Sequence, residues 1–448
     1  MLFSDESWPQ DIGAVAVLDG APLLDRNGRV RIDAVRDAVE RRLHLLPRFR
    51  QVLYRPRRGL GWPAWVDSAD FDIRNHVKVV ELPGPTDDTQ LLLAVERLRA
   101  RRLDPTRPLW EMWFLPGLSD PRVGLFIRLH HVIADGMAGV AALRLLLDAE
   151  ASVPQPPAQS WTPAPRPTDR NLLRDNLRRR ADQLRQWGSA LTHPATTVGH
   201  LRAGWPAMRA LVTAVPGPRT SLNQLVGPHR ALALFRTELS VVKQVAHTHS
   251  ATVNDVLLAM TGGGLRNLLE HRGEPVDDLT LPSYVPVSLR RDRVRPGTGN
   301  LISQMVVPLP LGTMDPGERL RRIATETATL KAASRPSLGN VFRSRLLARV
   351  LLPVIARKRV NVETADLPGP PMPLYFSGAR VLEVFPLLNL IGNVTLGVGA
   401  LSYAGWFMIM AVGDADSYPD IDVFTTGLRR EWQGLIASQE KSVGTSAF

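Results

Sequence analysis

The chain of 448 residues contains no cysteine. This absence excludes disulfide bonds, thiolate metal sites and a cysteine nucleophile, although it does not identify a cellular compartment. The first ten residues, MLFSDESWPQ, contain neither a basic segment nor an apolar run. The sequence therefore predicts no signal peptide at this point, and we expect a cytoplasmic location.

Lysine is also scarce, because only five of the 55 basic residues are lysines and the rest are arginines. The formal net charge is +12, so the surface attracts polyanions such as nucleic acid, anionic lipid headgroups or phosphate-bearing cofactors. No zinc-finger spacing and no heptad pattern accompanies this charge, and we therefore expect no nucleic-acid partner. The hydrophobic share of 44% and the length fit a globular chain with two hydrophobic cores.

Charged residues are absent from residues 384–413, a stretch long enough to raise the question of a membrane span. A spanning helix needs about 20 consecutive apolar residues. This stretch is interrupted by Asn389, Asn393 and five glycines. The pattern favours buried β-strands with tight turns over a transmembrane helix.

Alternating and helical periodicities divide the chain into two α/β parts separated by a linker. Six prolines between residues 154 and 167 exclude a helix or a central strand, and a basic helix is expected over 172–187. The predicted domains are residues 1–150, a linker of 151–220, and residues 221–448. Expected strands are 13–18, 123–132, 284–289, 302–309 and several within 384–412; expected helices are 32–45, 91–103, 137–149, 250–269, 317–333 and one from about 423.

The segment from His130 to Gly136 reads HHVIADG and fits the pattern HHxxxDG between a predicted strand and a predicted helix. A loop in this position can project side chains into a cleft. One reaction that such a loop could catalyse is acyl transfer from a thioester to a hydroxyl. An imidazole can accept the hydroxyl proton at neutral pH. The thioester is already an activated donor, so this acyl transfer needs neither a metal nor a covalent intermediate. We assign His131 as the general base, with His130 packed behind it. Asp135 is expected to hold the loop through an arginine, and Gly136 to allow the tight turn.

Three structural alternatives exist for this segment. Adjacent histidines can bind a metal, but neighbouring side chains rarely face one ion and no further ligand spacing is present, so we expect no metal site. Both histidines can instead be core residues with satisfied hydrogen bonds. Asp135 can serve only as the N-cap of the following helix.

Together with HHxxxDG, several short motifs resemble the bacterial wax ester synthase/diacylglycerol acyltransferase group of the chloramphenicol acetyltransferase-like superfamily. The similarity extends over nearly the whole chain. Its motifs are Gly13–Gly20 (GAVAVLDG), Pro108-Leu109-Trp110, Ser221-Leu222-Asn223 with Gly227 and Arg230, Asn254-Asp255, the strand from Val285 to Arg290 (VPVSLR), Pro368-Gly369-Pro370, Pro373-Leu374-Tyr375 and Gly378-Ala379.

This resemblance implies two α/β sandwich domains of the chloramphenicol acetyltransferase type, joined by a crossover, with an active-site tunnel at their interface. It implies an O-acyltransferase that uses acyl-CoA as co-substrate, without a bound cofactor, and makes triacylglycerol or wax esters from a diacylglycerol or a long-chain alcohol. It also implies peripheral association with the inner membrane or with lipid inclusions. The residues expected on the substrate side are Pro108, Leu109, Trp110, Asn254, Asp255 and Arg290.

Each of these substrate-side residues also has a structural alternative. Asn254 is a natural helix N-cap, and Pro108, Leu109 and Trp110 are suited to core packing. Arg290 is either the partner of Asp135 or one of many surface arginines. The basic stretch of residues 341–359 either lies on a membrane surface or packs on the core.

One departure from the family pattern concerns Asn361-Val362, which five residues separate from Pro368. We expect these five residues to reshape the tunnel wall. Two rival functions remain: another HHxxxDG acyltransferase acting on a different hydroxyl or an amine, and a weakly active or non-catalytic protein of the lipid-inclusion surface.

Overall fold

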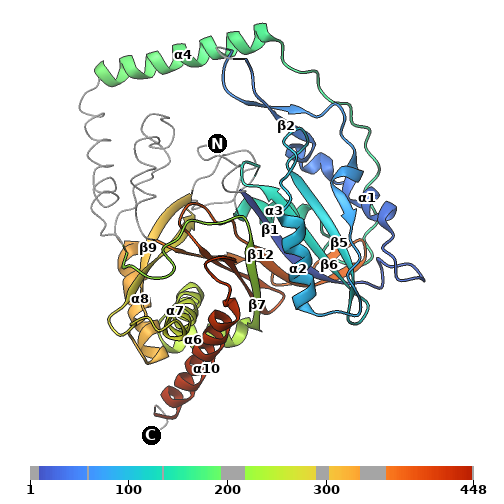
Figure 1. The fold of residues 1–448 in the computed structure, drawn as a ribbon. Coiled ribbons are helices and arrows are strands. Elements are labelled where there is room, and N and C mark those ends of the chain that lie inside the picture. Colours follow the sequence, from blue (N-terminus) through green and yellow to red (C-terminus); the bar gives the residue numbers. More distant parts are fainter. Residues whose placement is uncertain are drawn as a thin grey trace.

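The computed structural model describes residues 10–57, 60–133, 136–192, 217–288, 302–332 and 360–445. Within these ranges the chain builds two six-stranded mixed sheets, each with its own set of helices (Figure 1). This arrangement confirms the predicted α/β class with two sheet-rich domains. The predicted basic segment of residues 341–359 lies outside the described residues.

The first sheet has the strand order β11-β12-β1-β6-β5-β4. Its strands are β1 (Asp11–Asp19), β4 (Val77–Val79), β5 (Trp110–Leu118), β6 (Arg122–His130), β11 (Tyr375–Phe376) and β12 (Ala379–Leu387). The helices of this half are α1 (Ile32–Glu40), α2 (Asp88–Arg99) and α3 (Gly136–Leu145), and a hairpin of β2 (Gln51–Tyr54) and β3 (Ala64–Asp67) stands apart from the sheet.

The second sheet has the strand order β7-β14-β13-β10-β8-β9. Its strands are β7 (Arg230–Glu238), β8 (Thr280–Ser288), β9 (Ile302–Pro310), β10 (Val362–Pro368), β13 (Leu396–Tyr403) and β14 (Trp406–Asp414). A second hydrophobic core packs this sheet against its helices. These are α6 (Leu239–Thr248), α7 (Val253–His271), α8 (Pro316–Ala332) and α10 (Ile421–Thr445).

The two sheets do not follow the linear division at residue 221. Strands β11 and β12 come from the C-terminal part of the chain, yet β12 pairs antiparallel with β1 over Gly13 to Leu18. Arg236 on β7 forms ion pairs of 2.7 Å with both Glu383 on β12 and Asp88 on α2. The C-terminal part of the sequence therefore completes the sheet that carries the histidine motif.

Several element ends differ from their predicted positions for local reasons. The helix predicted over 32–45 is wrong in its last turn, because α1 ends at Glu40 and a short 3₁₀ turn follows. Pro47 disfavours helical geometry at Leu46 and thereby helps to end the helical stretch. The helix predicted within 250–269, after a short lead, begins at Val253, because the Thr252 side chain accepts the Asp255 N–H in a capping box.

The uncharged stretch of residues 384–413 forms the end of β12 and all of β13, with most of β14, as predicted. Across the described ranges, no helix combines the length and the apolar character that a membrane span requires. The five residues between Val362 and Pro368 belong to β10, whose parallel register with β13 runs without interruption from Val362 to Pro368. They extend a strand and do not form an inserted loop.

Strand β10 also carries a carboxyl group in an unfavourable environment. Burial raises the pKa of Glu363 to about 7, although its side chain is partly accessible to solvent. The ordinary value is 4.5, so between that pH and about 7 the folded chain binds more protons than the unfolded chain. The free energy of unfolding therefore falls as the pH rises through this range.

We expect Glu363→Gln to stabilise the chain by about 1–3 kcal/mol at about pH 8, since it removes the desolvated charge. At about pH 4.5 the native and variant chains should unfold at nearly the same temperature. Thermal unfolding at both pH values measures this difference, and Glu81→Gln, at an exposed glutamate, is the matched control. A variant that is less stable than the native chain at the higher pH would contradict the expectation.

Candidate active site

The histidine pair stands at the end of β6, where the residues just before β5 and β1 hold its backbone. The His130 N–H donates to the Leu109 carbonyl at 2.9 Å, and the His131 N–H donates to the Gln10 carbonyl at 2.8 Å. His130 is also the register partner of Asp11 on β1. The predicted strand over 123–132 therefore ends two residues early, and the chain turns at the histidines.

His130 is an interior residue with only 1% of its surface exposed. Its ring Nδ1 accepts the backbone N–H of Val132 at 3.0 Å, and its carbonyl accepts the N–H of Ile133 at 2.9 Å. Because a backbone N–H can only donate, Nδ1 must be unprotonated, and the neutral ring carries its proton on Nε2. His130 therefore holds the turn that presents the next residue.

His131 is partly exposed in that turn, whereas His130 is enclosed. Gly136 is the first residue of α3. Asp135 and Arg290 both lie outside the described residues, so their expected pairing remains a prediction. Of the two histidines, His131 is therefore the one with access to solvent.

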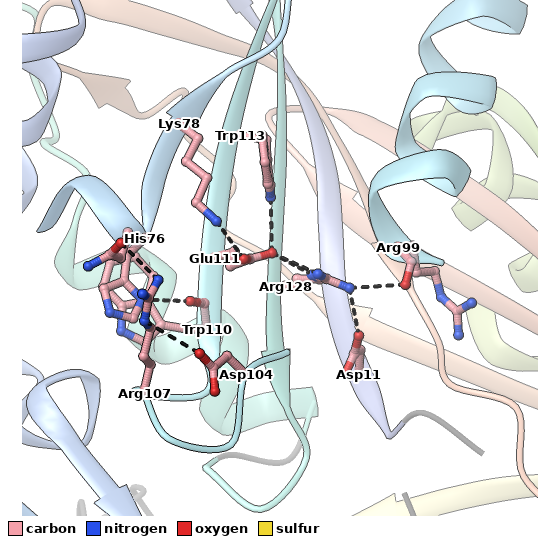
Figure 2. A network of polar contacts seen from close by, with 11 residues as sticks. Asp11, His76, Lys78, Arg99, Asp104, Arg107, Trp110, Glu111, Trp113 and Arg128 are labelled. Carbon is pink, nitrogen blue, oxygen red and sulfur yellow. Dashed lines mark hydrogen bonds and ion pairs between the residues drawn. The ribbon is translucent and has the colours of Figure 1, made fainter. Parts of the chain in front are cut away.

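Pro108, Leu109 and Trp110 are all buried beside the histidine strand. Trp110 Nε1 donates to the Phe49 carbonyl at 2.8 Å. The Trp110 ring stacks on His76 with a centroid separation of 4.7 Å (Figure 2). Burial lowers the pKa of His76, so this ring remains neutral within the stack. The motif supports β5, and through the Leu109 carbonyl it also positions His130.

Asn254 and Asp255 lie in the first turn of α7. Asp255 is buried, and its carboxylate accepts the N–H and hydroxyl of Thr252 at 2.8 and 2.7 Å and the Thr327 hydroxyl at 2.8 Å. These three contacts use the carboxylate for capping and for joining α7 to α8. Asn254 is partly exposed on the first turn of the same helix.

A largely buried network of charges centres on Arg128 of β6, the strand that ends in His130 (Figure 2). Arg128, two residues before His130, donates to Asp11 on β1 at 3.0 Å and to Glu111 on β5 at 2.7 Å. It also donates to the carbonyl of Arg99 at 3.0 Å, and Lys78 on β4 donates to Glu111 at 2.7 Å. One guanidinium thus connects strands β1 and β5 with the end of α2.

The charge state of Glu111 depends on this network. Desolvation acts to raise the pKa of Glu111, but the charge of Arg128 and hydrogen bonds from Lys78 and Arg128 bring it below its ordinary value. The carboxylate is therefore ionised and paired at neutral pH. Sequence reasoning missed this network, although a charged residue inside the apolar run LFIRLHH is a sign of a buried ion pair.

Nothing in the described ranges suggests a metal centre, since no three histidine, aspartate or glutamate side chains there are grouped to hold an ion. The arrangement instead offers one accessible imidazole on a rigid support. Such an imidazole can accept and return a proton.

Comparison with known families agrees with this chemistry. The profile described as "Wax ester synthase/diacylglycerol acyltransferase catalytic domain" matches residues 2–257, and the profile "WS/DGAT C-terminal domain" matches residues 298–435. A protein of Mycobacterium bovis described as a putative diacylglycerol O-acyltransferase is 30% identical over 96% of this chain and 92% of its own. A probable diacylglycerol O-acyltransferase of Mycobacterium tuberculosis matches with the same identity and coverage.

Solved structures show the same fold at lower sequence identity. The wax ester synthase/diacylglycerol acyltransferase from Marinobacter aquaeolei VT8 superposes with a TM-score of 0.71 at 20% identity, covering 98% of this chain and 97% of that one. The starter condensation domain of rhizomide synthetase, in complex with C8-CoA, has a TM-score of 0.59 at 16% identity, covering 97% of this chain and 91% of that one. On the strength of the family profiles and the mycobacterial relatives, this chain belongs to the wax ester synthase/diacylglycerol acyltransferase family of acyltransferases.

Proposed function

We propose that this protein transfers the acyl group of acyl-CoA to the free hydroxyl of a diacylglycerol, with His131 as the general base. The observation that supports this most strongly is the difference between the two histidines of the HHxxxDG motif. His130 is enclosed and holds a turn through Nδ1, while His131 is partly exposed beside it. An accessible imidazole on a fixed turn is suited to accept a hydroxyl proton.

His131 alone can carry the proton through the whole reaction. His131 takes the proton of the acceptor hydroxyl as its oxygen attacks the thioester carbonyl. The tetrahedral intermediate collapses with cleavage of the carbon–sulfur bond, and the departing CoA sulfur receives the proton from His131. Because the thioester is already activated, acyl-CoA serves as a substrate and we infer no need for a bound cofactor.

Diacylglycerol is the preferred acceptor in this proposal, because both mycobacterial relatives described above are named as diacylglycerol O-acyltransferases. A long-chain alcohol is the second candidate, since the family description also includes wax ester synthases. Both acceptors are nearly insoluble in water. We therefore propose that the protein works at the surface of a membrane or a lipid inclusion.

The test is release of free CoA from palmitoyl-CoA by the native chain, with detergent-dispersed diacylglycerol or hexadecanol as acceptor. Acceptor-dependent release is expected with diacylglycerol, together with labelled triacylglycerol as the product. Faster release with hexadecanol would instead assign a wax ester synthase. CoA release that is independent of either acceptor would contradict transfer to a lipid hydroxyl.

A further inference from the structure

The helix α4 (Asp169–Thr192) occupies an outlying position in the fold. Figure 1 shows α4 along the top of the molecule, away from both sheets. Its first turns contact the β2–β3 hairpin, where Gly61 packs against the buried Asn176. A cavity of about 340 Å³ lies between hairpin and helix and is lined by residues that include Trp62, Trp65, Leu172 and Arg179. The hairpin and α4 therefore present a joint surface.

This surface exposes large apolar side chains. Leu173 and Leu177 on α4 are 43% and 57% exposed, and Trp62 at the hairpin is 48% exposed. The leucines are four residues apart and so share one face of the helix. Large apolar side chains exposed on neighbouring elements are typical of an interaction site.

Arginines continue the same face. Arg170 precedes Leu173 by three residues and Arg180 follows Leu177 by three, so all four side chains form one stripe along the helix. Arg174 lies beside this stripe and is exposed as well. Over its whole length α4 has six arginines against three aspartates.

We propose that Trp62, Leu173, Leu177 and the arginines 170, 174 and 180, together the α4 surface, dock the protein on an anionic phospholipid layer. Helices that combine a basic face with exposed leucines lie in the plane of the membrane interface, and indole rings favour the headgroup level. Guanidinium groups pair with lipid phosphates in the geometry that arginine prefers. The proposal deepens the proposed function by naming the surface through which a lipid acceptor layer is approached.

The charge of the α4 surface argues against a second copy of the chain as its occupant. A two-fold contact would place the same basic stripe of both copies at one interface. Like charges brought together in this way repel each other. An anionic layer satisfies the leucines and the arginines together.

The experiment is co-sedimentation of the full chain with vesicles of phosphatidylcholine alone and of phosphatidylcholine mixed with phosphatidylglycerol. The native chain is expected to bind the mixed vesicles more tightly and to dissociate at high salt. In the variant R170Q/R174Q/R180Q, binding should fall about a hundredfold, since each arginine near such a surface contributes about fivefold. L173S/L177S/W62S should lose at least about tenfold, because it removes the apolar contact.

A matched control carries the same change of charge on other elements, at the exposed residues Arg26, Arg29 and Arg101, as R26Q/R29Q/R101Q. It is expected to bind within about twofold of the native chain, since non-local charge acts weakly at physiological salt. Glutamine forms helices about as well as arginine, so circular dichroism should show unchanged helicity in all variants. Equal losses in the control and in the α4 variant would overturn the proposal, as would equally tight binding to neutral vesicles.

Failure of the α4 surface is distinguishable from failure of the proposed function. Vesicle binding is measured also with His131→Ala, which should bind like the native chain because binding needs no turnover. CoA release is measured on detergent-dispersed substrates, where no bilayer is present. A native chain that releases CoA but does not sediment with anionic vesicles overturns the surface alone. A solution dimer that L173S/L177S/W62S dissociates would assign the surface to a second copy and overturn the lipid assignment.

Discussion

Replacement of His131 by alanine is expected to reduce acceptor-dependent release of CoA by about 10²–10⁴-fold, the range that loss of a general base produces. Alanine at position 131 keeps the backbone N–H that donates to the Gln10 carbonyl, and it leaves in place the two bonds by which the carbonyl and Nδ1 of His130 hold the turn. The variant should therefore fold normally and lose rate rather than affinity. Steady-state kinetics with palmitoyl-CoA and diacylglycerol separates kcat from KM and measures this directly.

Two further variants decide which histidine is the base. His130→Asn keeps a side-chain oxygen that can accept the N–H two residues ahead, as asparagine does in Asx turns. It should preserve the turn and most of the rate. His247→Ala, at an exposed histidine of α6, controls for loss of an imidazole elsewhere and should leave the rate unchanged. A rate that survives in His131→Ala but collapses in His130→Asn would move the base to His130.

The sequence was informative wherever a local pattern determines the structure. Short apolar segments identified β1 and β6, and a helical periodicity over 91–103 identified α2, because each pattern depends only on neighbouring residues. The motif at His130 and His131 was recognisable for the same reason. Strand β6, a turn and α3 follow one another within a short segment.

Pairings between segments that are distant in the sequence could not be predicted from local patterns. Strand β12 joins β1 across more than 350 residues of chain, and no residue within either strand specifies that partner. The division at residue 221 therefore does not predict which sheet receives residues 375–387. The ion pairs of Arg236 with Asp88 and Glu383 likewise became visible only once α2, β7 and β12 were placed together.

The charged network around Arg128 shows the same limit of prediction from sequence. An arginine within an apolar strand indicates a buried partner, but it does not identify Asp11, 117 residues earlier, or Glu111. The pairing also has a structural consequence. It fixes β1, β5 and β6 relative to one another at the level where the histidine turn begins.

Replacement of Arg128 by alanine should therefore destabilise the chain strongly, by about 3–5 kcal/mol, the effect of removing one partner from a buried ion pair. Its side chain is only 1% exposed, and that of Asp11 only 3%. Without Arg128 the Asp11 carboxylate loses its 3.0 Å ion pair in the interior, and Glu111 retains Lys78 and the Trp113 indole as donors. Thermal unfolding should show a midpoint several degrees below that of the native chain.

The matched control lies on the same strand. Arg122 on β6 is 40% exposed and pairs with Asp120 at 3.7 Å, so Arg122→Ala should change the free energy of unfolding by no more than about 0.5 kcal/mol. The double variant Arg128→Met/Asp11→Asn removes both opposite charges together and should recover part of the lost stability, because the interior then no longer holds the Asp11 charge without Arg128. Equal destabilisation by Arg122→Ala and Arg128→Ala would show that the buried ion pairs of Arg128 contribute no more to the free energy of unfolding than an exposed pair. A double variant less stable than Arg128→Ala would show that Asp11 supports the strand end through contacts other than this ion pair.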